Sequence, residues 1–112
     1  MKYTTTEKYN AVVIEIKGNV MGGPEAQEFN DFIRQLLEDE KKNVVINLAK
    51  VKFMNSSGLG MLITAYTTMK NGGGVLKLAN ATEKINSLLV ITKLITIFDN
   101  YESVDEAIKS FS

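Results

Sequence analysis

Residues 44–60 constrain the fold more than any other part of the chain. They open with an apolar run at 44–48, whose length suits a buried strand, and end in Asn55-Ser56-Ser57-Gly58 before a helical pattern. Asn and Ser side chains accept hydrogen bonds from the free N–H groups of a helix's first turn, and glycine lets another backbone approach closely. The segment therefore predicts a strand, a turn and a helix, with a serine hydroxyl at a helix N-terminus, where negative charge is favoured.

Further strands and helices are expected to alternate along the rest of the chain. Strands are expected at 3–8, 11–17, 75–79 and 95–98, with Gly18-Asn19 ending the second; helices are expected to begin at Pro24, after Asn55, after a Thr82 cap and at a Ser103–Glu106 capping box. Alternating elements of this kind form βαβ units. The sequence predicts an α/β fold, a single domain over residues 1–112 with a mixed, mostly parallel sheet of four to five strands and about four helices.

The candidate site lies where two strands end. Ligands and partners of such folds meet the loops at the carboxyl ends of the strands, and the turn at 55–58 occupies one such end. The loop at 18–23 leaves another strand and is expected nearby. Its Val20 and Met21 either form a small apolar, adaptable binding patch, or one of them packs under the first helix.

Residues 53–60, Phe-Met-Asn-Ser-Ser-Gly-Leu-Gly, resemble the signature of the bacterial anti-sigma factor antagonists of the STAS-domain family. That signature usually reads Asp-Ser-Ser/Thr-Gly-Leu-Gly, and its first Ser is the phosphate acceptor, so the resemblance implies phosphorylation of Ser56. The residues expected to bind a partner are Asn19, Val20, Met21, Gly22, Asn55, Ser56, Ser57, Gly58 and Leu59.

The resemblance also implies a function, that of a regulator that switches partners and is not an enzyme. In that family the unmodified protein binds an anti-sigma factor, usually a serine kinase with an ATPase fold, and so frees the sigma factor. The kinase phosphorylates the acceptor Ser, which dissociates the complex, and a PP2C-type phosphatase restores the unmodified protein. No cofactor or metal is expected.

Two departures from the family pattern keep other interpretations open. Asn55 stands where the family has Asp, and Gly18-Asn19-Val20-Met21 stands where it commonly has Gly-Glu-Ile/Leu-Asp. A kinase that relied on those carboxylates would work poorly here, whereas a phosphate would meet less repulsion. One alternative is a STAS interaction module that regulates a phosphatase or kinase without being phosphorylated. Another is a small-ligand sensor, for instance of a nucleotide at this helix N-terminus. On spacing alone, Ser56 and Ser57 merely cap a helix.

Composition excludes several classes of function. The 13 basic and 13 acidic residues cancel, so the basic surface typical of nucleic-acid binding is not expected. The chain has no Cys and no His, which removes disulfides, thiolate chemistry and Ser-His dyads. No apolar run reaches the roughly 20 residues needed to span a bilayer, and the polar N-terminus is unlike a signal peptide. We expect a cytoplasmic protein, monomeric and without membrane contact.

Overall fold

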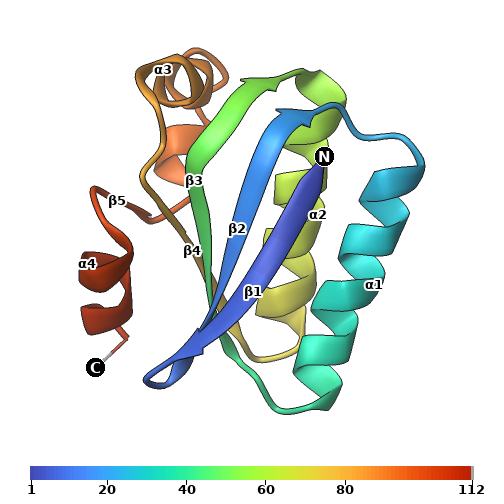
Figure 1. The fold of residues 1–112 in the computed structure, drawn as a ribbon, viewed down its shortest axis with the longest axis vertical. Helices are drawn as coiled ribbons and strands as arrows, with labels where there is room; N and C mark the ends of the chain where they lie inside the picture. Colours follow the sequence, from blue (N-terminus) through green and yellow to red (C-terminus); the bar gives the residue numbers. More distant parts are fainter. Residues whose placement is uncertain (112) are drawn as a thin grey trace.

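The computed structural model describes residues 1–111 of the 112-residue chain. Within that range, one five-stranded sheet carries helices on both faces (Figure 1). The elements are β1 Lys2–Lys8, β2 Ala11–Val20, α1 Pro24–Glu38, β3 Asn43–Met54, α2 Ser56–Asn71, β4 Val75–Ala79, α3 Glu83–Ile91, a 3-10 helix Leu94–Thr96, β5 Asn100–Tyr101 and α4 Val104–Lys109.

The sheet has the strand order β1-β2-β3-β4-β5, in which β1 is antiparallel to β2 and the other neighbours are parallel. This confirms the predicted α/β fold with a mixed, mostly parallel sheet. Because β2 and β3 run in the same direction, they end at the same edge of the sheet. The chain enters α1 after β2 and α2 after β3, so both helices begin at that edge.

The larger core lies between the sheet and helices α1 and α2, which cover the same face (Figure 1). α1 begins with Pro24 as its first residue and buries Phe29, Ile33 and Leu36 at helical spacing. Tyr3 of the edge strand packs edge-on against Phe29, with ring centroids 5.3 Å apart. These contacts fix the direction of α1 and therefore the loop that precedes it.

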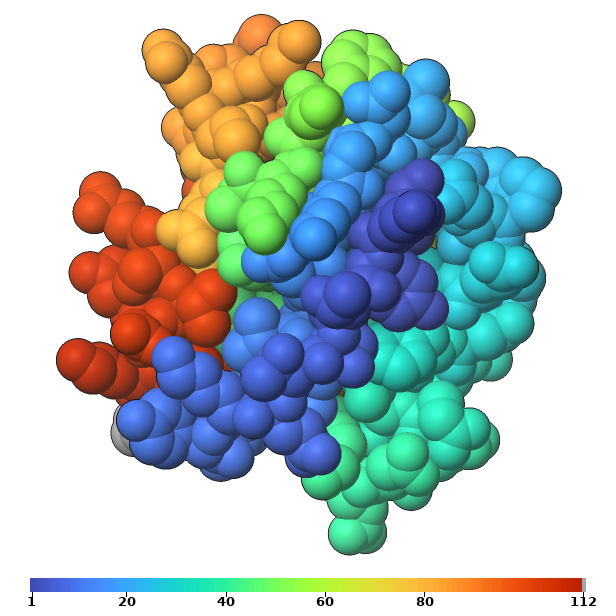
Figure 2. All heavy atoms as spheres, in the orientation of Figure 1, coloured from blue at the N-terminus to red at the C-terminus, as the bar shows by residue number. Residues whose placement is uncertain are grey.

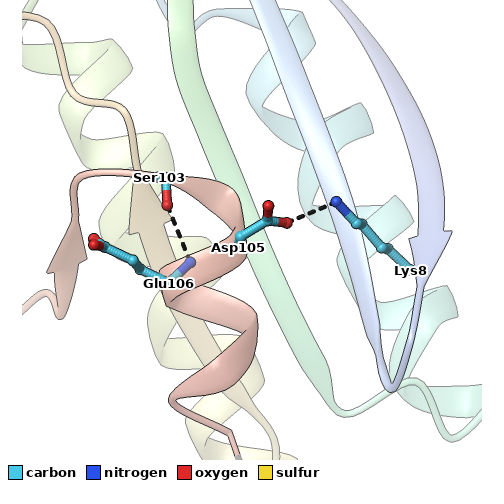
Figure 3. Close-up of polar contacts among 4 residues, drawn as sticks. All are labelled: Lys8, Ser103, Asp105 and Glu106. Carbon is cyan, nitrogen blue, oxygen red and sulfur yellow. Dashed lines mark hydrogen bonds and ion pairs between the residues drawn. The ribbon is translucent and has the colours of Figure 1, made fainter.

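A smaller core lies on the opposite face, under α4. It consists of Ala11, Val13, Val45, Ala79, Ala107 and Ile108. The Ser103 hydroxyl accepts a hydrogen bond of 3.1 Å from the Glu106 backbone N–H, which confirms the predicted Ser cap of α4 (Figure 3). Lys8 Nζ donates to Asp105 Oδ1 at 2.7 Å, so the tip of the β1–β2 hairpin is tied to α4.

Lys77 of β4 also fastens the end of α4 to the sheet. It is buried, and its Nζ donates to Ser110 Oγ at 2.6 Å. The ammonium lies 4.5 Å from the centre of the Phe111 ring and 5.4 Å from that of Tyr101. No carboxylate within residues 1–111 forms an ion pair with it. Lys77 Nζ also donates to the Tyr101 hydroxyl at 3.5 Å, so two hydrogen bonds and two aromatic faces take the place of a counterion.

Two segments differ from the sequence-based expectation. Residues 95–98 were expected to form a strand, but the chain forms a 3-10 turn there, and the fifth strand is Asn100–Tyr101. The Thr96 hydroxyl donates to the Lys93 carbonyl at 2.8 Å, and this local bond favours a turn over an extended chain. β2 does not end at Gly18-Asn19 but continues to Val20 through an irregularity in its pairing with β3.

No helix within residues 1–111 is both long enough and apolar enough to cross a bilayer.

Lys77 gives a test of how α4 is held. We expect Lys77→Met to leave the free energy of unfolding unchanged or raise it by about 1 kcal/mol, because burying a cation costs desolvation that an apolar side chain of similar length avoids. Lys77→Ala should lower it by about 2 kcal/mol, because it also removes the buried alkyl stem. Urea denaturation of both variants measures the difference. Equal losses would show that the ammonium's contacts, and not its stem, stabilise α4.

Candidate functional site

The turn between β3 and α2 has the geometry that its sequence predicts. Asn55 is the N-cap of α2, its backbone is extended (φ −97°), and its Oδ1 accepts a hydrogen bond from the Gly58 backbone N–H at 2.7 Å. Ser56 is the first residue of the helix and is exposed to solvent. The cap satisfies one free N–H of the first turn and leaves the Ser56 side chain outside the protein.

The end of β2 is locked against this turn. The Val20 carbonyl accepts a hydrogen bond of 3.3 Å from the Asn55 backbone N–H. The same carbonyl lies so close to Gly58 that a Cβ added there would overlap it. Glycine at position 58 is therefore required by packing, and the contact sets the position of α2 relative to β2.

The loop between β2 and α1 continues over the turn. Gly22 has a left-handed backbone (φ +79°), which favours glycine, and a Cβ added there would lie 2.8 Å from the Ser57 Cβ. This loop and the first turn of α2 therefore form one surface. The sequence placed them near each other from strand order alone, and the structure brings them into contact.

The nine residues expected to bind a partner divide by exposure. Those open to solvent are Asn19, Met21, Ser56 and Ser57, those half-buried are Gly22 and Asn55, and those buried are Val20, Gly58 and Leu59. Met21 is 45% exposed, whereas Val20 is fully buried. Of the two alternatives left open for Val20 and Met21, packing inside the protein therefore holds for Val20, and exposure holds for Met21. The Val20 side chain belongs to the main core, because β2 runs on to this position.

The site carries little negative charge of its own. The first turn of α2 contains no acidic residue, so no carboxylate opposes the partial positive charge of the helix N-terminus. Within residues 1–111 there is no group of three or more His, Cys, Asp or Glu side chains that could hold a metal ion. The chemistry available here is a hydroxyl at a helix N-terminus, where an attached anion is favoured.

An apolar groove next to the turn was missed by the sequence analysis. It lies between the end of β3 and α3 and has a volume of about 210 Å³; its lining includes Phe53, Lys84 and Ile91. Phe53 is 40% exposed and Ile91 is 79% exposed, and the Lys84 ammonium lies 5.5 Å from the centre of the Phe53 ring. The available signal was the spacing of Lys84, Ser87 and Ile91, which places them on one side of α3.

The STAS domain family model matches residues 2–107, nearly the whole chain. The chain belongs to the STAS domain family. This confirms the resemblance drawn from residues 53–60.

Sequence relatives within the STAS family include antagonists of anti-sigma factors. The anti-sigma-B factor antagonist of Bacillus subtilis (strain 168) is 36% identical over 63 residues, which span 56% of this chain and 58% of that protein. The anti-sigma-B factor antagonist of Staphylococcus aureus (strain NCTC 8325 / PS 47) is 28% identical over 91 residues, 81% of this chain and 82% of its own. Antagonism is a binding activity and not a catalysed reaction, which agrees with the expectation of a regulator.

Solved STAS structures share the fold. An anti-sigma factor antagonist from Mycobacterium paratuberculosis superimposes with a TM-score of 0.81 at 20% identity, covering 97% of this chain and 92% of the other. The Bacillus cell fate determinant SpoIIAA in its phosphorylated form gives a TM-score of 0.74 at 17% identity, covering 99% of this chain and 100% of the other. At these identities the likeness establishes the shared fold.

Gly58 and Gly60 provide a matched pair for testing the junction. Gly58→Ala should lower the free energy of unfolding by about 1–3 kcal/mol, because the new Cβ would overlap the Val20 carbonyl. Gly60→Ala, two residues further along the same helix, has nothing within 4 Å of its Cβ and should raise the free energy by about 0.5–1 kcal/mol. Thermal or urea denaturation measures both. Similar effects at the two positions would refute the proposed close contact.

Proposed function

We propose that this STAS domain is an anti-sigma factor antagonist that acts by partner switching and is controlled by phosphorylation of Ser56. The observation that carries the proposal is the exposure of Ser56 at the first position of α2, on an edge that it shares with the loop after β2. The relatives named as antagonists of anti-sigma factors support this function. We further propose that the protein works in the cytoplasm as a monomer and that residues 1–112 form one STAS domain.

The partner proposed here is an anti-sigma factor that is also a serine kinase with an ATPase fold. In the unmodified state, the partner packs over Ser56 and over exposed apolar side chains such as Met21 and Phe53. Burial of such side chains gives affinity at a site with few charges. A PP2C-type phosphatase is the second proposed partner and restores the unmodified state.

The switch follows from the chemistry of the phosphate group. Phosphorylation adds about −1.5 to −2 charges and three strong acceptors at the hydroxyl. In the free protein the N-terminus of α2 stabilises this charge. A partner packed over Ser56 would have to desolvate the phosphate and make room for it. A cost of about 3 kcal/mol would weaken binding roughly a hundredfold.

The surroundings of the two serines favour Ser56 as the acceptor. Ser57 is exposed as well, but a Cβ added at Gly22 would lie 2.8 Å from the Ser57 Cβ, so the loop after β2 packs against this residue. Ser56 precedes it at the start of the helix and is exposed. Ser57 therefore serves as the matched control for Ser56.

The proposed switch predicts opposite effects of two Ser56 substitutions. Ser56→Ala should bind the anti-sigma factor as tightly as the unmodified protein, and Ser56→Asp should bind about tenfold to a hundredfold more weakly, because only the second places a charge in the interface. Ser57→Ala should keep both binding and phosphorylation. Titration calorimetry with the partner kinase is the measurement. Equal affinity of Ser56→Ala and Ser56→Asp would place Ser56 outside the interface.

A second candidate function is an interaction module that regulates a phosphatase or kinase without being phosphorylated. The observation that favours it is the neutral cap, since Asn55 stands beside Ser56 and the first turn of α2 has no carboxylate. A kinase that uses an Asp at this position to orient the hydroxyl would find none here.

The mass of the protein after incubation with ATP and the partner kinase separates the two functions. Under partner switching, one phosphate is added to the unmodified protein and none to Ser56→Ala. Under the module interpretation, the unmodified protein gains no phosphate. Asn55→Asp tests whether the missing carboxylate matters. Because Asn and Asp cap helices about equally well, the stability of this variant should differ little from that of the unmodified protein. Phosphorylation of Asn55→Asp but not of the unmodified protein would identify the missing carboxylate as the cause.

A further inference from the structure

A row of lysines crosses three neighbouring strands on the face of the sheet that carries α4. The pairing register places Lys2 of β1 opposite Lys17 of β2, and Lys17 opposite Lys50 of β3. Lys52 follows on β3, and all four lysines line one shallow hollow of about 610 Å³ together with Met1, Gly18 and Ala49. We call Lys2, Lys17, Lys50 and Lys52 the lysine row.

The lysine row is not explained by the stability of the fold. Like charges directly opposite one another on neighbouring strands are destabilising. Lys17 has a lysine opposite it on each side. Among residues 1–111, one ion pair involves a lysine of the row. It joins Lys50 Nζ to Glu15 Oε1 at 3.4 Å. One carboxylate therefore offsets part of the charge of four lysines, all of which are exposed.

The face that holds the lysine row is open to solvent. α4 packs against Val13, Val45 and Ala79 on this face, nearer the other end of the strands. Figure 2 shows the N-terminal strands and β3 at the surface between α4 on one side and α1 on the other. The row is therefore accessible to a partner.

We propose that the lysine row binds an acidic segment of a partner protein. A concentrated positive charge attracts carboxylates, and α4 lies further along the same face of the sheet. Glu102, Asp105 and Glu106 are exposed on and before α4, on the same face. A duplex nucleic acid or a flat anionic membrane wide enough to cover this face would also meet those carboxylates. A narrow acidic peptide segment can contact the lysines without approaching the carboxylates on and before α4.

This inference rests on the proposed function in one respect, the identity of the partner. Lys17 lies three residues before Val20, where β2 ends, and Lys52 precedes the cap Asn55 by three residues, so the row adjoins the edge that displays Ser56. A partner bound over Ser56 can place an acidic segment on the row at the same time. The row would then supply salt-dependent association, while burial near Ser56 supplies most of the affinity.

The experiment uses the full chain and a synthetic peptide of alternating glutamate and serine, titrated at low and at high salt. We expect binding at low salt that weakens as salt is added. Replacing Lys2, Lys17 and Lys50 together with Gln should weaken it at least about fivefold. The control replaces Lys42, Lys70 and Lys93, which are exposed elsewhere and change the net charge equally. It should bind the peptide within about twofold of the unmodified protein.

Several results would overturn the inference. They are the absence of peptide binding at low salt, equal weakening by the control variant, and tighter binding of duplex DNA or of phosphatidylserine vesicles than of the peptide. Because the peptide does not involve Ser56, these outcomes are independent of the Ser56 substitutions. If the peptide binds but Ser56→Asp leaves the affinity for the anti-sigma factor unchanged, the binding role of the lysine row stands and the proposed switch is rejected.

Lys17→Gln separates a binding role from a structural one. Removing the central lysine relieves repulsion from Lys2 and Lys50, so the thermal unfolding midpoint should stay the same or rise. Peptide affinity should fall in the same variant. A fall in both quantities would indicate that Lys17 stabilises the fold, and the lysine row would then need no partner to explain it.

Discussion

The site depends on a single backbone contact, the one between the Val20 carbonyl and Gly58. Val20 ends β2 and Gly58 lies in the first turn of α2, so the contact joins two elements that are far apart in sequence. The same carbonyl accepts the N–H of Asn55, whose side chain caps the helix. Because one carbonyl fixes both the cap and the helix, the orientation of Ser56 is set by the sheet. An exposed serine is thereby held at a defined position without being covered.

The two faces of the sheet play different parts. One is closed by α1 and α2 over a continuous apolar core. The other is covered over only part of its length, by a short α4 that is fastened through Lys77 and through the Lys8–Asp105 ion pair. This leaves the lysine row uncovered on a face that also lies next to the Ser56 edge. The main core therefore fixes the geometry, and the incompletely covered face supplies accessible charge.

Local signals in the sequence were sufficient for most of the fold. The caps at Asn55, Thr82 and Ser103 each make the predicted side-chain hydrogen bond, because capping depends only on residues within one turn. The short β5 was misplaced, since a two-residue strand has no periodicity and is defined by its pairing with β4. For the same reason, the sequence did not decide which of Val20 and Met21 is buried. It follows from the continuation of β2 beside β3, a contact between distant segments.

The lysine row, like the burial of Val20, depends on the pairing of distant strands, and it lies next to the candidate site. Lys17 faces Lys50 only because the pairing of β2 with β3 shifts by one residue after Glu15, and no local pattern reveals that shift. Once the register is known, the departures from the family signature can be seen to have the same electrostatic effect. Asn55, Asn19 and Met21 remove carboxylates from an edge that the lysine row already makes positive. An acidic partner would be repelled by the usual carboxylates and is attracted by this surface. The neutral cap and the lysines are therefore two parts of one electrostatic preference.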